Sequence, residues 1–172
     1  MSHVASAAFG RRARAKTRVG TFGGVKHDTL SDVNCSVART WSVVGERWTM
    51  LILREAFRGT RRFDAFQARL GLARTLLADR LGVLVQEGIF ERVPYQDRPE
   101  RFEYRLTPKG LDLYPVLLAL MEWGDRYKVD DPPVTLIHKG CGQAAQPHMT
   151  CSHCNEPIGY FDLRAEYAAD AW

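Results

Sequence analysis

Three cysteines and one histidine near the end of the chain have the residue types and spacing of metal ligands. His138 and Cys141 are separated by two residues, and so are Cys151 and Cys154. This spacing lets two side chains of one turn reach the same tetrahedral ion, and three thiolates with one imidazole suit zinc. Four protein ligands leave no open coordination position for catalysis. The pattern therefore predicts a structural zinc ion in a small zinc-ribbon-like unit.

Other chemistry remains open for this cysteine unit, which occupies residues 134–160. An iron–sulfur cluster or a reversible disulfide are alternatives, and His148 or His153 could replace His138 as the fourth ligand. A unit of this size does not fold alone without a metal or a cross-link. Thiols stay reduced in the cytoplasm, the compartment we expect, which favours a metal over a disulfide framework. The unit could brace a dimer or lie beside an effector site.

Cys35, the remaining cysteine, lies near the start of the first expected helix. The helix dipole at such a position lowers the pKa of a thiol and favours its reactivity. Cys35 is therefore a candidate sensor of oxidants or electrophiles. The alternative is an inert, packed cysteine.

Basic side chains are concentrated in the first and middle parts of the chain. Residues 1–27 hold six Lys or Arg and no acid, whereas residues 111–172 hold four basic and nine acidic side chains. Residues 58–105 hold ten basic and seven acidic side chains. This segregation predicts a polyanionic partner that docks on the middle of the chain and not on its acidic end.

A helix expected over residues 74–87 carries the residue types that read DNA. Leu77, Leu81, Leu84 and Val85 fall on one side of it and should face the core. The opposite face is small and polar, as close approach to base edges in the major groove requires. The DNA contacts predicted on this helix are Arg74, Thr75 and Ala78, with Arg80 at the edge of the face on a phosphate. Asp79 should pair locally, because it would repel phosphate.

Further arginines lie where a neighbouring hairpin and helix would touch the DNA backbone. Arg98 and Arg101 flank a polar, proline-containing turn, and Arg62 precedes a short helix. Arginines on such a hairpin contact the backbone or enter the minor groove. We therefore add Arg62, Arg98 and Arg101 to the predicted DNA contacts.

The elements that position these residues are expected in the order helix, helix, helix, hairpin, helix. Apolar spacing predicts helices over 37–57, with a break at Gly45, and over 63–70 and 74–87. Strands over 89–93 and 101–106 follow, and Thr107-Pro108 begins a helix to about 127. We find no internal repeat. This order is that of a winged helix-turn-helix, a mainly α fold with a small β-hairpin (α+β).

Four regions divide the chain. Residues 1–30 are expected as a flexible basic arm, and residues 31–130 as the domain for DNA binding and dimerisation, whose first helix begins near Ser31 or Asp32. Residues 131–160 hold the linker Asp131-Pro132-Pro133 followed by the cysteine unit, and residues 161–172 are expected as a short helical or frayed tail. The apolar stripe of helix 108–127 could be buried against a partner or within the core, and we expect Trp41 and Trp48 in the core.

Five segments, in order, resemble the HxlR-type transcriptional regulators over roughly residues 35–127. They are Cys35-Ser36-Val37-Ala38 with Gly45-Glu46-Arg47-Trp48 and Leu51-Ile52-Leu53-Arg54; Arg62-Phe63-Asp64; Leu76-Leu77-Ala78-Asp79-Arg80-Leu81 with Glu87-Gly88; Tyr104-Arg105-Leu106-Thr107-Pro108-Lys109-Gly110; and Pro115-Val116-Leu117 with Trp123-Gly124. The resemblance implies a bacterial, cytoplasmic, nucleoid-associated homodimer with a winged-helix fold. The first and last helices of such proteins make the dimer, and some of them use an N-terminal cysteine as a switch.

The function that the sequence favours is a repressor that binds an inverted-repeat operator in double-stranded DNA as a homodimer, with an unidentified small-molecule or redox effector and no membrane partner. The alternative is a zinc-stabilised module that binds a protein or RNA. An enzyme is excluded, because the chain has no phosphate-binding loop, no serine elbow and no open metal site. The operator, the effector and the regulated genes cannot be read from the sequence.

Overall fold

The computed structural model describes residues 27–168. Most of the expected basic arm, and residues 169–172 of the tail, lie outside this range. Within residues 27–168 no helix is both long enough and apolar enough to span a bilayer.

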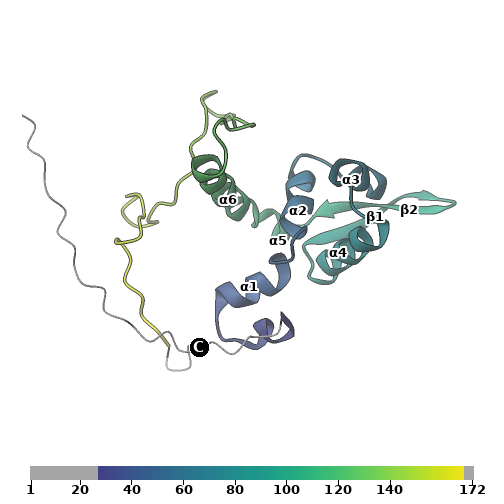
Figure 1. Cartoon of the computed structure of the whole chain (residues 1–172), viewed down its shortest axis with the longest axis horizontal. Coiled ribbons are helices and arrows are strands. Elements are labelled where there is room, and N and C mark those ends of the chain that lie inside the picture. The colour runs from purple at the N-terminus through teal and green to yellow at the C-terminus, as the bar shows by residue number, and fades with distance from the viewer. Residues whose placement is uncertain (1–26, 169–172) are drawn as a thin grey trace, which may run out of the picture.

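Helices and one hairpin follow each other in the order that the sequence predicts for a winged helix-turn-helix. Figure 1 shows α2, α3 and α4 gathered at the base of the hairpin, with α1 and α6 on the other side. The elements are η1 (His27–Asp32), α1 (Ser36–Val44), α2 (Thr49–Phe57), α3 (Phe63–Leu70), α4 (Arg74–Gln86), β1 (Phe90–Asp97), β2 (Glu100–Leu106), α5 (Pro108–Leu111) and α6 (Tyr114–Tyr127).

The hydrophobic core lies between α2, α3, α4 and the start of the hairpin. Its seven fully buried large side chains are Phe66, Phe90, Ile52, Leu53, Leu77, Leu81 and Leu84. Burial of each such side chain contributes about 1.5–3 kcal/mol. The core therefore fixes the orientation of α4, and with it the face that α4 presents to solvent.

A buried carboxylate joins α2 to α3. Glu55 is 3% exposed in its side chain and lies 2.9 Å from Arg54 and 3.6 Å from Arg69 of α3. Gly71 then ends α3 in the left-handed conformation, with φ at 64°. This conformation favours glycine, which explains the short turn between α3 and α4.

The first helix begins later than the start expected near Ser31 or Asp32, and it ends at the break expected at Gly45. The residues near Ser31 form the short 3-10 helix η1, and α1 begins at Ser36 with Cys35 as its N-cap residue. At the predicted break, the Trp41 side chain packs over Gly45, where an added Cβ would lie 2.6 Å from Trp41 Nε1. A close contact and a helix end therefore coincide at Gly45.

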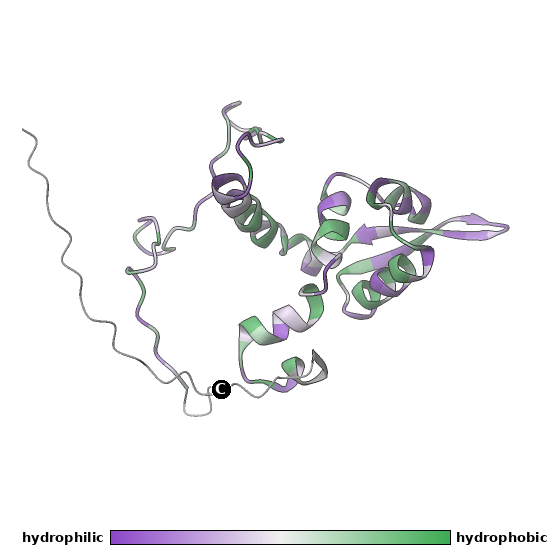
Figure 2. Ribbon diagram, viewed as in Figure 1, coloured by the Kyte–Doolittle hydropathy of each residue, from purple (hydrophilic) through white to green (hydrophobic). Residues whose placement is uncertain are grey.

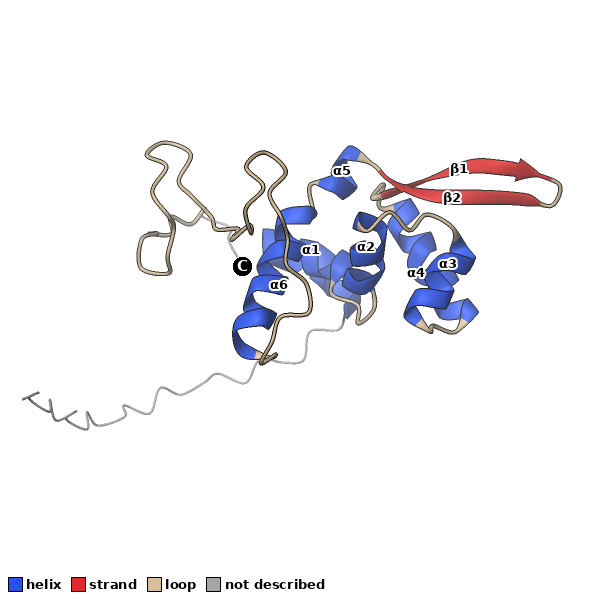
Figure 3. Ribbon diagram, turned by 90° about the horizontal axis from the view of Figure 1, so that it is seen from above, coloured by secondary structure: helices blue, strands red, loops and turns tan. Residues whose placement is uncertain are grey.

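The hairpin is longer than predicted and carries a β-bulge. β1 and β2 pair from Phe90 opposite Leu106 to Asp97 opposite Glu100, with a register shift between Pro94 and Gln96. The sequence prediction ended the first strand at residue 93, just before Pro94, and proline cannot donate to a ladder. The sheet has only two strands, so the free edge of β1 accommodates Pro94. Figure 3 shows the hairpin projecting well beyond the helices.

The last predicted helix is also broken in two. α5 ends at Leu111, and α6 begins at Tyr114 with Pro115 in its first turn. A continuous helix would need a backbone N–H at residue 115, which proline lacks. The ring of Pro115 would also clash with the preceding turn of such a helix. The break changes the direction of the chain, so α6 leaves the winged helix and runs back past α2, which it contacts.

The residues after α6 contain no helix or ladder as far as residue 168. Residues 131–160 form two loops, each closed by a single β-bridge, and a zinc-ribbon sheet is not formed. The helical form of the tail is absent from residues 161–168.

Candidate nucleic-acid interface

The side of α4 that faces solvent is the one predicted to read DNA. Leu77, Leu81 and Leu84 are fully buried. On the opposite face five residues are exposed: Arg74, Thr75, Ala78, Asp79 and Gly82. An exposed strip with so few bulky side chains allows the helix backbone to approach the base edges of a major groove.

Arg74 begins α4, and its guanidinium is held at one edge of this strip. It stacks 4.8 Å from the centre of the Phe63 ring and forms an ion pair with Asp64 at 3.7 Å. Both charged side chains are more than 70% exposed, so this ion pair contributes little free energy. Arg74 can therefore exchange Asp64 for a base or a phosphate. Asp79, which we expected to pair locally, has no ion pair with any residue of 27–168.

Arg80 lies on a different side of α4 from Arg74. Its side chain is 24% exposed and forms an ion pair with Glu46, which lies between α1 and α2, at 3.6 Å. Its Nε is buried without a hydrogen-bond partner. The predicted phosphate contact of Arg80 stays a prediction, and it requires the side chain to leave Glu46.

The two predicted arginines of the hairpin lie at its tip. Arg98 occupies the turn between β1 and β2, where Gln96 Nε2 donates to its carbonyl oxygen at 3.0 Å, and Arg101 is the second residue of β2. Both side chains are exposed, and neither forms an ion pair within the described residues. Figure 2 shows the outer half of the hairpin as strongly hydrophilic.

A cleft of about 390 Å³ separates the start of α4 from the hairpin. Arg74 lines it from the helix side and Arg101 from the hairpin side. Tyr95 and Phe102 supply its aromatic wall. The structure thus brings two predicted DNA contacts, far apart in the sequence, to one surface.

Arg62 precedes α3 and is tied to the hairpin. Its Nε lies 3.6 Å from Glu103 Oε1, and its guanidinium lies 4.4 Å from the centre of the Tyr95 ring. Its backbone forms an antiparallel bridge with Glu103, and Tyr104 N donates to Arg61 O at 2.7 Å. Arg62 remains 60% exposed and available to a phosphate.

Glu103 and Tyr95 belong to this surface, and the sequence analysis missed both. Arg105 donates two hydrogen bonds to Glu103 Oε2, and these bonds, with the charges of Arg105, Arg62 and Arg61, lower the pKa of Glu103. For Glu103 the available signal was its spacing of two residues from Arg101 and Arg105 in β2, because every second side chain of a strand points to the same face.

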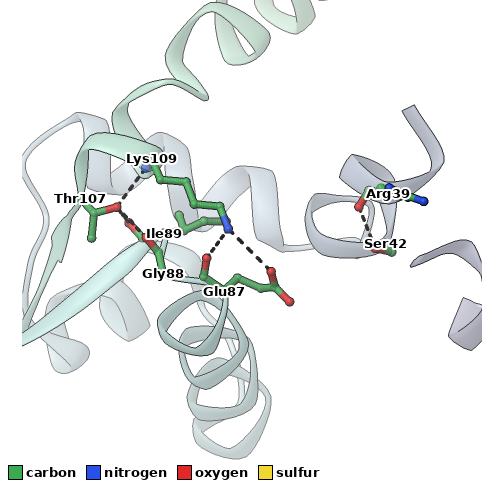
Figure 4. Close-up of polar contacts among 8 residues, drawn as sticks. Arg39, Ser42, Glu87, Gly88, Ile89, Thr107 and Lys109 are labelled. Atoms are coloured by element: carbon green, nitrogen blue, oxygen red, sulfur yellow. Dashed lines mark hydrogen bonds and ion pairs between the residues drawn. The ribbon is translucent and has the colours of Figure 1, made fainter. Parts of the chain in front are cut away.

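Polar contacts connect the end of α4 to the segment that leads into α6, as Figure 4 shows. Lys109 Nζ donates to the carbonyl oxygen of Glu87 and lies 3.9 Å from its carboxylate. Thr107 Oγ1 donates to Gly88 O at 2.6 Å and also accepts from Gly110 N, which confirms Thr107 as an N-cap. A shift of α5 would therefore act on the end of α4.

A large apolar surface is exposed on α1 and α6. No residue of α6 is buried against the described chain. The exposed large apolar residues are Val37 and Trp41 on α1, and Tyr114, Val116, Leu120, Trp123 and Tyr127 on α6. Trp41 is 52% exposed, so its expected place in the core of the single chain is wrong, whereas Trp48 packs against the core as predicted. Apolar patches of this kind mark interaction surfaces.

The cysteines lie away from the hairpin, and none of the four forms a disulfide. Cys35 is half-buried at the start of α1. His138 Nδ1 lies 3.3 Å from Cys141 Sγ. Backbone N–H groups of His153 and Cys154, together with the Cys154 side chain, bond to Cys151 and lower the pKa of its thiol. Within residues 27–168, three or more potential ligands are not gathered at any one point.

Comparison with known proteins adds a family to this geometry. Residues 43–132 match the family described as HxlR-like helix-turn-helix. The uncharacterized HTH-type transcriptional regulator Rv3095 of Mycobacterium tuberculosis is 51% identical over 125 residues, which are 72% of this chain and 79% of Rv3095.

Two solved structures are similar as well. PA1607, described as a candidate transcription factor, is 37% identical with a TM-score of 0.73, and the match covers 81% of this chain and 99% of PA1607. The redox regulator HypR in its oxidized form is 30% identical with a TM-score of 0.51, and the match covers 55% of this chain and 99% of HypR. The family match spans more than half of the residues, and the relatives named here are regulators and not enzymes. The chain belongs to the HxlR-like helix-turn-helix family of transcriptional regulators.

Proposed function

We propose that this protein represses transcription by binding operator DNA as a homodimer, with α4 in the major groove and the hairpin on the adjoining backbone or minor groove. The observation that carries the proposal is the exposed strip of α4, which begins at Arg74 and Thr75 beside the cleft to the hairpin. Such a strip is what direct reading of base edges requires.

Each predicted contact has a distinct role in this arrangement. Arg74 forms two hydrogen bonds with a guanine, Thr75 contacts a base or a phosphate, and Ala78 packs on a thymine methyl group. Arg98, Arg101 and Arg62 neutralise phosphates and set the register of the protein on the duplex, without reading its sequence.

Dimerisation gives the operator its symmetry. The exposed stripe of α6, with Leu120 and Trp123, and the exposed residues Val37 and Trp41 of α1 supply the apolar surface for a two-fold interface. Two copies of α4 related by a two-fold axis read an inverted repeat, with half-sites about one or two helical turns apart. A change in the dimer reaches α4 through the bonds of Lys109 and Thr107.

Selection of bound duplexes from a random pool, followed by sequencing, tests the proposal. The full chain and its Arg74→Ala variant are compared at moderate salt. The proposal requires an inverted repeat with the wild type, and loss or relaxation of one position per half-site with the variant. Recovery of no motif, with affinity that vanishes as salt rises, would overturn it and favour a module that binds protein or RNA.

A thiol switch at Cys35 is a second proposal, and the likeness to the redox regulator HypR favours it. Cys35 is the N-cap residue of α1, next to the exposed stripe of that helix. Alkylation joins its sulfur to the electrophilic carbon with loss of the thiol proton, and the added group would alter how α1 packs against the partner. The cytoplasmic location expected from the sequence stays a prediction.

The Cys35→Ser variant tests the switch directly. We expect an alkylating agent to change the DNA affinity of the wild type and to leave that of Cys35→Ser unchanged. Ser36→Ala, which keeps Cys35 and changes the residue next to it in α1, serves as the matched control and should respond like the wild type. An equal response of the wild type and Cys35→Ser would exclude Cys35 as the sensor.

A further inference from the structure

The two loops that follow α6 have the same backbone hydrogen bonds, displaced by 13 residues. Ala145 N donates to Leu136 O at 2.7 Å, and Ile158 N donates to Met149 O at 2.9 Å. The single bridges follow the same offset, Ile137 with Ala144 and Thr150 with Pro157. The structure therefore contains an internal repeat that the sequence analysis did not find.

The turns inside the two loops repeat as well. His138 N donates to Gln143 O, and Cys151 N donates to Glu156 O, both at 2.9 Å. The residue after the second potential ligand has a left-handed backbone in each loop, with φ at 71° for Gly142 and 60° for Asn155. Asparagine is among the few residues other than glycine that adopt this conformation readily, so both positions suit the same tight turn.

The residue types that match between the two turns are those of potential metal ligands. His138 and Cys151 occupy the first position of the turn, and Cys141 and Cys154 occupy the fourth. The two residues between them differ, Lys-Gly in the first loop and Ser-His in the second. What recurs is a turn that presents two ligands side by side, as the 3.3 Å contact of His138 Nδ1 with Cys141 Sγ shows.

We propose that the two loops close on one zinc ion, which is held by His138, Cys141, Cys151 and Cys154 of the same chain. Three thiolates and one imidazole in tetrahedral geometry are a ligand set typical of structural zinc. Each turn supplies half of this set. The described structure has the two halves formed but not joined, so metal binding brings them together.

The connection between the loops is short enough for this closure. Three residues, 146–148, lie between Ala145, the last of the first loop, and Met149, the first of the second. A chain of that length spans at most about 14 Å even when fully extended. The connection thus limits how far apart the two loops can lie, and a single ion can link them without a change in α6.

The unit needs such a link, because its apolar side chains find no core. Ile137 of the first loop and Met149 of the second are 56% and 65% exposed. Val134 and Leu136 line an apolar groove with Met50 of α2 and Leu117 of α6. The first loop is therefore anchored beside α6, and zinc would fix the second loop to that anchor.

Metal analysis of the full chain, purified under reducing conditions, tests the proposal. We expect about one zinc ion per chain, whatever the oligomeric state, and absorption bands of tetrahedral thiolate-bound cobalt after replacement of the zinc. The His138→Ala variant should lose bound zinc by at least about tenfold, and His138→Cys should retain it. The matched control is His148→Ala, because His148 Nδ1 bonds to the carbonyl oxygen of Gln146.

Proteolysis provides a readout that does not depend on the amount of zinc measured in the purified protein. Removal of zinc by a chelator should expose residues 131–160 to cleavage and leave α4 and the hairpin protected. Three results would overturn the proposal: four freely titratable thiols with no bound metal, one zinc per two chains, or a Cys151–Cys154 disulfide that forms while zinc is present. None of these results bears on operator binding.

Discussion

Neighbouring side chains restrict the position of Arg74, one of the predicted DNA contacts. Phe63 limits the movement of its guanidinium, and Asp64 offers only a weak, exposed ion pair that DNA can replace. Arg98 differs, because it stands at the hairpin tip without an ion pair to any described residue. These surroundings predict base recognition for Arg74 and charge neutralisation for Arg98.

Replacement of Arg74 by alanine should weaken binding to the selected operator by about 1–3 kcal/mol and relax one position of each half-site. The reason is loss of the two hydrogen bonds to guanine. Titrations of operator variants by fluorescence anisotropy measure this effect. Arg164→Ala removes the same charge from the exposed tail and should leave both affinity and preference unchanged. Uniform weakening of every sequence by Arg74→Ala would refute the base contact.

Replacement of Arg98 by alanine should weaken all duplexes alike and reduce the magnitude of the slope of log K against log salt by about one. The reason is loss of one phosphate contact for each side chain removed. Binding measured over a salt series, with Arg164→Ala as the reference, tests this. A changed sequence preference would show instead that the hairpin reads bases.

At the scale of the elements, the hairpin is fixed to the helices by the pairing of residues 61–62 with β2. Glu103 is central to this attachment, since Arg62 and Arg105 both reach its carboxylate. The attachment therefore depends on the ionised form of Glu103, which the lowered pKa favours.

The lowered pKa of Glu103 predicts that the folded chain loses stability in acid. Its pKa is lower in the folded chain than in the unfolded chain, so the unfolded chain binds the proton more readily. The stabilisation is complete above the unfolded value of about 4.3 and is lost as pH falls through the lower folded value. The unfolding midpoint of the wild type in urea should therefore approach that of Glu103→Gln below about pH 4. A constant difference between the two proteins at all pH values would contradict this role.

Element boundaries show what the sequence could and could not predict. The order of elements and the exposed face of α4 followed from apolar spacing, because burial of Leu77, Leu81 and Leu84 leaves only one orientation. The division at Pro115 was missed, although proline chemistry indicates it.

The cleft that unites Arg74 with Arg101, and the attachment of Arg80 to Glu46, depend on tertiary contacts that no local pattern encodes. The repeat of the loops was missed because it lies in backbone hydrogen bonds.

At the scale of the whole molecule, α1 and α6 leave apolar residues exposed on one chain. Trp41 and Trp123 are each more than half exposed. Exposure of two tryptophans is costly unless a partner covers them, and aromatic side chains are enriched at the centres of interfaces. The proposed homodimer explains this exposure.

A charge in the stripe of α6 should break the dimer. Leu120→Asp places a carboxylate twice in a two-fold interface, and we expect the dimer to weaken by about 2 kcal/mol or more. Sedimentation velocity over a concentration series measures the shift to monomer. Leu111→Asp makes the same change at an exposed leucine of α5 and should leave the dimer intact. Dissociation by Leu111→Asp alone would place the interface elsewhere.

The central claim is that two copies of α4, related by the dimer, read two half-sites on one face of the duplex. The most direct measurement is the affinity of the dimer for the selected operator when base pairs are inserted between its half-sites. An insertion of about five base pairs, half a helical turn, rotates one half-site to the opposite face of the DNA. The account predicts that affinity falls to that of a single half-site. Unchanged affinity after this insertion would contradict it.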